Sequence, residues 1–505
     1  MRKLLPFLLI ILLISFSSKA YSDYSTPGTG VSWTLTDLVS NSSGVVTFSG
    51  GEYYLNDTLV ISASDTIKVT SNGNFKFAGN TMIDIFGVFR ITPPDSFKIT
   101  AADTNQKFLG LKFEEFSDPS ILKKVIMEYG NAIRLLNSDM IIDSCIIRYN
   151  TQNSSFGSGA IALFQSNPMI SNNIIYRNRR AAIQSGANIS SAPKIINNLI
   201  YENDTDNGNY PQINFGATGT DTILIKNNII RGGPFPMAGG IAFLPIGNAN
   251  IRIEGNTITH NRYGIALASA NTFAIIDNNR IDSNNIDNNP NTGGSGLNFN
   301  GNSTIVAICT NNAIRGNLWG VTIQGTAKPN LGNLTTPTPF DDGANHIYGN
   351  GNSGQIYDLY NNTPDSIKAE NNNWGTIDFD SVEAHIFHKP DNASLGFVDY
   401  LPIAPPVNIQ EIGSNKNIQS YYLHDSYPNP FNPISTIVFE IPVVSFVKVR
   451  VFDMIGREID NLVNQQLSQG SYKIQWNASR HPSGIYFVRL EANGLVLSKK
   501  LVLSK

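Results

Sequence analysis

A short motif that joins apolar residues to asparagine recurs along most of the chain. Each copy reads apolar-x-x-Asn-x-Ile-x-x-Asn, or nearly so, as in residues 168–178 and 251–261. The first asparagine position, here called the anchor, holds Cys145, Asn173, Asn198, Asn228, Asn256, Asn279, Asn312, Asn345 and Asn372. Successive anchors lie 28, 25, 30, 28, 23, 33, 33 and 27 residues apart. A unit of this length cannot bury its own apolar residues, so the repeat predicts a solenoid of stacked coils.

The residues after each anchor alternate between apolar and polar types, which is typical of a β-strand with one buried face. The second position after the anchor is apolar throughout: Ile147, Ile175, Ile200, Ile230, Ile258, Ile281, Ile314, Ile347 and Trp374. The fifth position is nearly always asparagine: Asn150, Asn178, Asn203, Gly233, Asn261, Asn284, Asn317 and Asn350. A further short strand follows a loop of variable length, as in residues 159–163 and 264–267. The pattern predicts an all-β fold with three short strands in each coil.

Stacking would place each strand roughly 4.8 Å from the same strand of the next coil. Asparagine suits the turns because it tolerates the left-handed conformation, and stacked asparagine side chains can hydrogen-bond into a ladder. Cys145 and Cys309 fall six coils apart, hence roughly 29 Å from each other, which is too far for a disulfide. We therefore expect both cysteines to be packing residues.

The N-terminus has the pattern of a secretory signal peptide over residues 1–22. Arg2 and Lys3 precede an apolar run from Leu4 to Phe16, and small residues follow. The run is shorter than the roughly 20 residues of a membrane-spanning helix, although an uncleaved anchor is the alternative. The mature chain is thus expected to have no transmembrane anchor. A formal net charge of −3 gives no footprint for nucleic acid as a partner.

The repeat resembles the right-handed parallel β-helix superfamily that includes pectate lyases and NosD-like repeat proteins. The resemblance covers roughly residues 45–400. The segments 58–79 and 86–91 are similar to the first coils of such proteins, and 370–403 is similar to a closing coil with a polar cap. The resemblance implies a right-handed parallel β-helix with N-terminal and C-terminal caps over residues 23–401.

The composition changes after this region. Residues 402–425 are interpreted as a linker, and residues 426–505 contain five alternating apolar segments separated by turn residues, which predicts a small Ig-like β-sandwich. The motifs SYPNPFNPISTIVFEIP, VFDMIGREI and SGIYFVRLEANG resemble the type A sorting domain of type IX secretion. That resemblance implies recognition by the secretion translocon and sorting machinery, passage through the periplasm, and a secreted or outer-membrane surface-attached product. A fibronectin-like spacer or binding module is the alternative.

Candidate ligand-binding residues form a row three positions after the anchors, opposite in direction to the buried isoleucines. The row holds Arg148, Tyr176, Tyr201, Arg231, Thr259, Asp282, Arg315 and Tyr348. Tyrosine can stack on sugars, and arginine can bind carboxylates or sulfates. A second, incomplete row holds Arg180, Phe235, Tyr263 and Trp319. The two rows suggest an elongated glycan platform, although tyrosine and arginine are also ordinary strand residues that cover their neighbours.

Evidence for catalysis is sparse. Tyr201, Arg231 and His260 lie on consecutive coils and are the weak catalytic candidates for a polysaccharide lyase, a class of enzyme that often uses Ca²⁺. The chain lacks the Arg-x-Pro-x-x-Arg pattern of pectate lyases and the Gly-His-Gly of polygalacturonases. No cofactor is evident. His385 and His388 would share one face of a short capping helix, but two ligands do not make a metal site.

Two hypotheses follow. The first is an exported protein that binds polysaccharide or another surface through its solenoid face. The second is a divergent polysaccharide lyase or glycoside hydrolase that acts on acidic glycans. The row of tyrosine and arginine supports both hypotheses.

Overall fold

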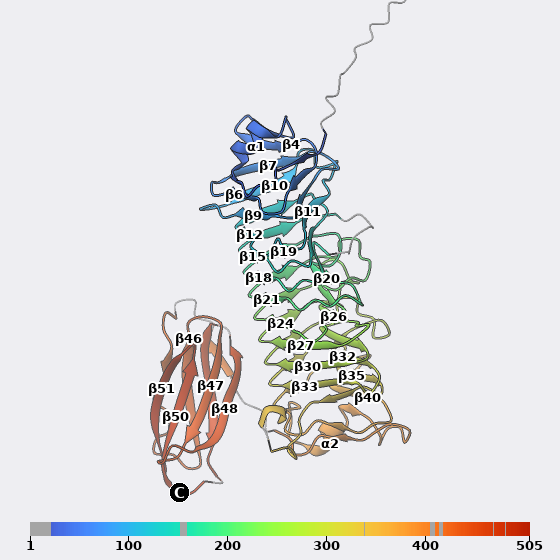
Figure 1. Cartoon of the computed structure of the whole chain (residues 1–505). Helices are drawn as coiled ribbons and strands as arrows, with labels where there is room; N and C mark the ends of the chain where they lie inside the picture. The colour runs from blue at the N-terminus through green and yellow to red at the C-terminus, as the bar shows by residue number, and fades with distance from the viewer. Residues whose placement is uncertain are drawn as a thin grey trace, which may run out of the picture.

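The structure, a computed structural model, describes residues 22–151, 159–337, 339–404, 410–413, 418–467, 469–479 and 481–505. The predicted signal peptide lies outside these residues except for Ser22. The described chain is almost entirely β, with one hydrophobic core in the solenoid and a separate core in the C-terminal region (Figure 1). None of its helices is long and apolar enough to span a membrane.

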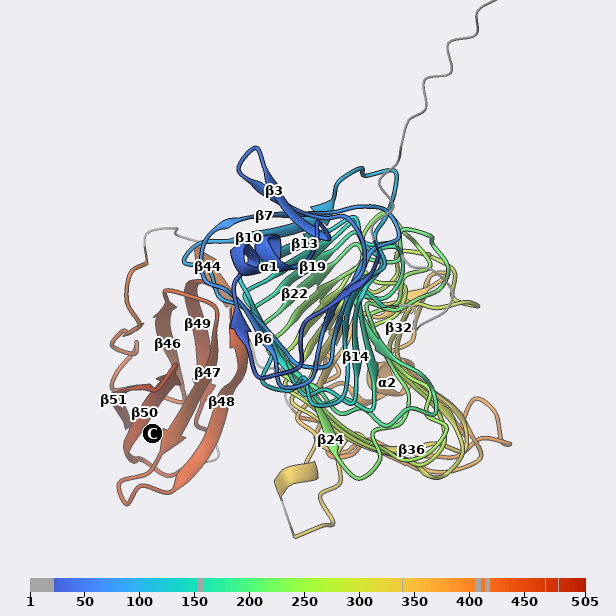
Figure 2. The same ribbon diagram turned by 45° about the horizontal axis from the view of Figure 1, so that its top comes forward.

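Three long sheets run the length of the solenoid and enclose its core (Figure 2). Sheet A has fourteen strands from β1 (Tyr24–Ser25) to β42 (Ile386–Phe387), and sheet B has fourteen from β2 (Ser32–Trp33) to β43 (Val398–Asp399). Sheet C has thirteen strands and begins with the antiparallel pair of β3 (Val46–Ser49) and β4 (Glu52–Leu55). Every other pairing in these three sheets is parallel. The predicted right-handed parallel β-helix is confirmed.

The strands that carry the candidate sites are short, as the sequence pattern predicts. In sheet C they are β7 (Gly73–Phe77), β10 (Phe97–Ala101), β13 (Val125–Glu128), β16 (Ile146–Arg148), β19 (Ile174–Tyr176), β22 (Leu199–Tyr201), β25 (Ile229–Arg231), β28 (Thr257–Thr259), β31 (Arg280–Asp282), β34 (Ala313–Arg315) and β37 (His346–Ile347). In sheet A they are β26 (Ile241–Phe243), β29 (Ile265–Ser269), β32 (Ser295–Gly301), β35 (Trp319–Gly325) and β40 (Leu359–Asn362).

The core is a set of columns in which one apolar residue stacks on the next. The isoleucines two positions after the anchors are all buried, and Trp374 ends the same series. Cys145 and Cys309 are buried free thiols, as expected for packing residues. Burial raises the pKa of both thiols, so neither is a reactive nucleophile.

The anchor asparagines form the predicted ladder. Each backbone N–H donates to the side-chain oxygen of the next anchor at 2.8–3.0 Å, and each side-chain nitrogen donates to the same oxygen at 2.9–3.0 Å. A second ladder along the next turn runs from Asn150 to Asn203 and again from Asn261 to Asn350. Gly233 interrupts it, and Gln212 and Asp358 accept from the last asparagine of each part.

Asparagine supplies most of the predicted left-handed turn residues, at the position before each anchor. The anchors themselves are not left-handed; the residue before each anchor is, with φ between 55° and 64° at Ser144, Asn172, Asn197, Asn227, Gly255, Asn278, Asn311, Ala344 and Asn371. The two adjacent asparagines of the motif therefore have different structural roles. The first adopts the left-handed conformation, and the second makes the ladder.

Caps close both ends of the solenoid. At the N-terminal end, α1 (Leu35–Asn41) begins with a capping box between Thr34 and Asp37 and buries Leu35 and Leu38 against the first coils. At the other end, α2 (Phe379–Glu383) ends before either histidine, so the predicted shared helical face is wrong. His385 lies 3.2 Å from Asp358, whereas His388 lies 3.0 Å from Glu383.

The C-terminal region contains two four-stranded antiparallel sheets, in the orders β44-β49-β46-β45 and β48-β47-β50-β51. The strands are β44 (Gln410–Gly413), β45 (Tyr422–Leu423), β46 (Ile434–Ile441), β47 (Ser445–Phe452), β48 (Glu458–Leu467), β49 (Gly470–Asn477), β50 (Gly484–Ala492) and β51 (Leu495–Leu503). The five predicted strands are present. The sequence pattern does not predict β48, and β44 and β45 lie within the predicted linker.

Candidate functional site

The predicted row of candidate residues lies on the outer face of sheet C. The strand register pairs Arg148 with Tyr176, Tyr176 with Tyr201, and Tyr201 with Arg231. The same register continues through Thr259, Asp282 and Arg315, and Tyr348 follows the end of β37. The period-2 alternation thus places these side chains in one row on the surface of the solenoid.

Tyr176 and Tyr201 stack on each other, with ring centroids 4.9 Å apart and planes only 3° apart. This geometry changes what the row can bind. Two stacked rings cover each other's inner faces, and Tyr149 makes an edge contact with Tyr176 at 5.7 Å. The ring face available for stacking on a sugar is therefore the outer face of Tyr201, on the side of Arg231.

Arg148 is held by the protein itself. Its guanidinium donates to Glu128 at 2.8 Å and to the Tyr176 hydroxyl at 2.7 Å. Lys98 pairs with the same Glu128, whose side chain is 4% exposed. Desolvation alone would raise the pKa of Glu128, but bonds from Lys98 and Arg148 outweigh it and leave the pKa lowered. Arg148 is therefore a structural residue of the row rather than a free anion receptor.

Glu128→Gln is expected to lower the free energy of unfolding by about 2 kcal/mol near neutral pH, because two charge-assisted hydrogen bonds become weaker. The lowered pKa means that the carboxylate stabilises the fold above its unfolded value of about 4.3 and loses this effect as the pH falls through its folded value. Urea unfolding at pH 7 and pH 3 measures this. The difference between variant and wild type should shrink at pH 3; an equal difference at both values would contradict the assignment.

The C-terminal part of the row is also engaged internally. Arg315 donates to the Tyr348 hydroxyl at 3.2 Å, and Asp282 pairs with Arg280 at 2.8 Å. Arg231 differs from both other arginines of the row. It is exposed, and within the described chain no ion pair joins it to a carboxylate.

A pocket of about 510 Å³ adjoins the tyrosine stack at the turn that leads out of sheet C. Tyr149, Arg177 and Arg179 line it together with Asp206 and Thr205. Arg177 pairs with Glu202 and Arg179 pairs with Asp206, both at 2.7 Å. The pocket thus has cationic groups whose charges are largely balanced by their neighbours.

The three catalytic candidates do not form a cluster. Tyr201 and Arg231 are register neighbours, but His260 lies on the following turn in a left-handed conformation, with φ 54°. Gly232 takes the equivalent turn position one coil earlier. No hydrogen bond or ion pair joins the three side chains in the part of the chain that is described.

The second predicted row is not a continuous platform. Tyr263 and Trp319 share one register position, with Ser295 between them. Arg262 lies over the Tyr263 ring, and burial raises the pKa of Tyr263 to about 12. Arg180 lies over Tyr210, at 4.9 Å from the ring centroid.

Trp319 instead belongs to an aromatic cluster that the sequence analysis did not find. Its ring centroid lies 4.7 Å from that of Tyr357 and 5.1 Å from that of Tyr360. Aligning the strands of sheet A at 296–300, 320–324 and 358–362, rather than the anchors, would have brought these residues together.

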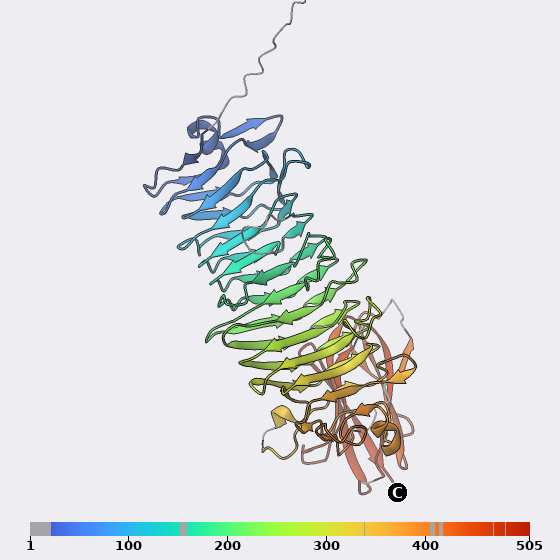
Figure 3. The ribbon, with the colours of Figure 1, turned by 90° about the vertical axis from the view of Figure 1, so that its right-hand side faces the viewer.

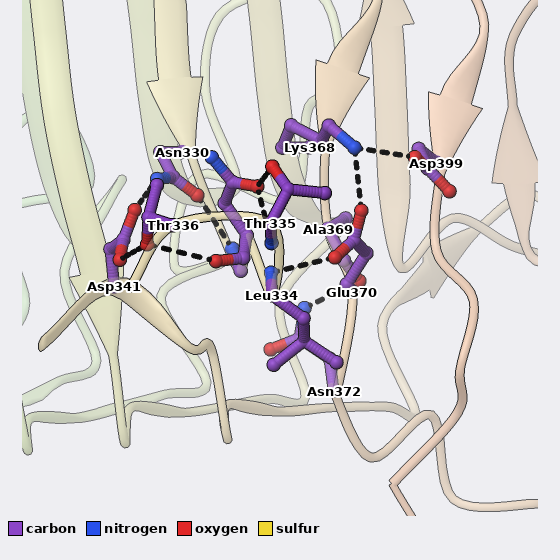
Figure 4. A network of polar contacts seen from close by, with 12 residues as sticks. Asn330, Leu334, Thr335, Thr336, Asp341, Lys368, Ala369, Glu370, Asn372 and Asp399 are labelled. Carbon is purple, nitrogen blue, oxygen red and sulfur yellow. Dashed lines mark hydrogen bonds and ion pairs between the residues drawn. The ribbon is translucent and has the colours of Figure 1, made fainter. Parts of the chain in front are cut away.

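A polar network at the end of sheet B fixes the loop between β36 (Lys328–Asn330) and β37 (Figure 4). Lys368 pairs with Glu370 at 2.6 Å and Asp399 at 2.7 Å, and Glu370 accepts from the Leu334 backbone at 2.7 Å. The carboxylates of Glu370 and Asp399 thus bind Lys368, and Glu370 also binds a backbone N–H of the loop. Among the residues described, no group of three or more His, Cys, Asp or Glu side chains is placed to hold a metal ion.

Comparison with known proteins identifies the C-terminal region. Residues 425–504 match the family model of the secretion system C-terminal sorting domain. No curated protein matches the chain significantly. Among solved structures, a double mutant of the tailspike protein of E. coli bacteriophage HK620, in complex with pentasaccharide, is 11% identical with a TM-score of 0.28, covering 95% of this chain and 87% of that chain. A single mutant of the same tailspike, also with pentasaccharide, is 10% identical with a TM-score of 0.26, covering 95% and 86%.

The sorting domain indicates export by the type IX secretion system, to the cell surface or beyond it. It accounts for residues 425–504 only, so the role of the solenoid has to be inferred from the surface of the solenoid itself. The chain is an exported parallel β-helix protein whose C-terminal region belongs to the family of secretion system sorting domains.

Proposed function

We propose that the solenoid binds an acidic glycan on the outer face of sheet C, at the step between Tyr201 and Arg231. One observation carries the proposal: the stacked tyrosines end in a ring face that borders an exposed arginine with no ion pair in the described chain. The ring face suits the apolar side of a sugar, and the guanidinium suits a carboxylate or sulfate. The pocket lined by Tyr149 and Arg177 lies beside the same tyrosine stack.

Export supports this role. We infer that residues 1–22 are removed, that the solenoid of residues 23–401 is the working part, and that residues 402–425 connect it to the sorting region at 426–505. The sorting machinery recognises that region, after which the solenoid is released or attached to the surface. In either case its outer face meets extracellular polysaccharide.

The test uses the full chain in native gels that contain polygalacturonate, chondroitin sulfate or dextran. We expect the two acidic polymers to retard the protein. Tyr201→Ala and Arg231→Ala should each weaken retention about tenfold, which corresponds to about 1.4 kcal/mol. High salt should weaken it as well, because the arginine contact is exposed. Arg280→Ala is the matched control, since Arg280 lies on the same face but is paired with Asp282.

The outcomes separate the hypotheses. Release of unsaturated or reducing ends, with or without Ca²⁺, would replace the binding proposal by the divergent lyase or hydrolase and make Tyr201, Arg231 and His260 the residues to test. Retention that survives both substitutions would move the site away from this step. No retention of either acidic polymer would refute the proposal.

A further inference from the structure

The outer face of sheet A carries an aromatic surface at its C-terminal end, on the side of the solenoid seen in Figure 3. Tyr360 of β40 stacks on Phe387 of β42, with centroids 4.7 Å apart and planes 9° apart. Trp319 and Tyr357 adjoin this pair. The Trp319 indole donates to the Pro290 carbonyl at 3.1 Å, which fixes the ring in place. All four rings remain half-buried rather than enclosed.

A row of amide side chains runs beside these rings. Asn300, Gln324 and Asn362 occupy one register position on three successive strands, two residues beyond the position of Tyr360. Asn300 and Asn362 are exposed, and Gln324 is half-buried. In the described structure, none of the three amide groups takes part in a hydrogen bond. In the turn ladders, by contrast, every asparagine amide is hydrogen-bonded within the fold.

A pocket of about 580 Å³ is lined in part by Leu318, the residue before Trp319. Pro290 and Leu318 line it, together with the hairpin of β38 (Gly351–Asn352) and β39 (Gln355–Ile356). Pro290 is also the residue that holds the indole, so the pocket and the aromatic surface are continuous. No residue that lines this pocket is charged, and its side chains include the amides of Asn288 and Gln355.

We propose that this uncharged surface, formed by the four rings, the amide row and the pocket, is a second glycan site that binds a neutral oligosaccharide. Aromatic rings accept the apolar faces of sugars. An amide offers both a donor and an acceptor, which matches a sugar hydroxyl. An acidic group bound in the pocket would lose water without gaining a cation, so the pocket lining selects against a charged ligand.

The site is distinct from the step at Tyr201 and Arg231. That step lies on sheet C and depends on a guanidinium, whereas this surface lies on sheet A near the C-terminal end of the solenoid, beside a pocket with no charged residue in its lining. Each of the two proposals can therefore be tested independently of the other. Substitutions at one site leave the other intact.

The test uses the full chain with dextran, laminarin and galactomannan in native gels. We expect at least one of these neutral polymers to retard the protein. The triple variant Asn300→Ala, Gln324→Ala, Asn362→Ala should weaken that retention at least tenfold while its unfolding midpoint stays unchanged, because none of the three amides is bonded within the fold. Tyr201→Ala should leave retention by the neutral polymer unaltered.

Fluorescence provides a second readout. Of the four tryptophans, Trp374 and Trp476 are buried and Trp33 lies in the first strand of sheet B, whereas Trp319 lies in the proposed site. Binding should shift the emission of the wild type, and Trp319→Phe should abolish the shift. Absence of retardation by all three polymers, or retardation that the triple variant keeps in full, would overturn the proposal.

Discussion

Replacing Asn256 by alanine is expected to lower the free energy of unfolding by about 3–6 kcal/mol. Its side-chain oxygen accepts from the backbone N–H and the amide of Asn228, both at 2.9 Å, and its nitrogen donates to the Ile225 carbonyl at 2.9 Å. All of these groups are buried. Alanine would leave several of them without partners, at about 1–3 kcal/mol for each buried group.

Chemical denaturation of the full chain measures this loss, and hydrogen exchange locates it. Exchange should accelerate first in β25 and β28, the strands that directly follow Asn228 and Asn256, because coils of a solenoid interact mainly with their neighbours. Asn300→Ala is the matched control, since the same substitution on the surface breaks no hydrogen bond and should change stability by less than about 0.5 kcal/mol. Equal effects of the two substitutions would show that the ladder does not stabilise the fold.

The sequence predicts the architecture well because the same constraints act in every coil. A buried isoleucine and a bonded asparagine at fixed positions define the register of sheet C without any knowledge of the loops. Loop lengths can then vary while the register holds, and the row from Arg148 to Arg315 was predictable for that reason.

The sequence could not predict which neighbouring side chains in a row stack on each other or form ion pairs. A pattern of residue types does not tell whether the face of a tyrosine ring is exposed or is covered by the next ring, as Tyr176 is covered by Tyr201. Nor does it tell that Glu128, which pairs with Arg148 in the strand register one coil before the row begins, neutralises the Arg148 guanidinium. The uncharged surface on sheet A was missed because its rings occupy different register positions: Trp319 pairs with Ser295, whereas Tyr360 pairs with Thr322.

Short-range signals failed where tertiary contacts decide the structure. The segment at 381–388 has helical spacing, yet α2 ends at Glu383 because β42 must pair with β40 to continue sheet A. His385 and His388 consequently face different carboxylates. Similarly, β44 pairs with β49 although its own residues lie in a segment interpreted as a linker.

Trp374→Ala is expected to destabilise the chain by about 3–5 kcal/mol, the range for removing a buried tryptophan. Trp374 is 1% exposed, ends the isoleucine series after Ile347, and packs against Tyr400 with centroids 6.5 Å apart. Its loss would open the C-terminal end of the core. Denaturation should show the loss of stability, and hydrogen exchange should accelerate in β37 and β40 more than in the first coils.

Trp374→Phe separates packing from hydrogen bonding at the same position. The indole N–H of Trp374 has no hydrogen-bond partner in the described part of the chain, although it is buried. Phenylalanine keeps most of the apolar contact and removes this unpaired donor, so two opposing effects of about 1–2 kcal/mol should nearly cancel. A variant as unstable as Trp374→Ala would mean that the shape of the indole, rather than apolar burial, closes the solenoid; near-wild-type stability would establish that the cap works by burial alone.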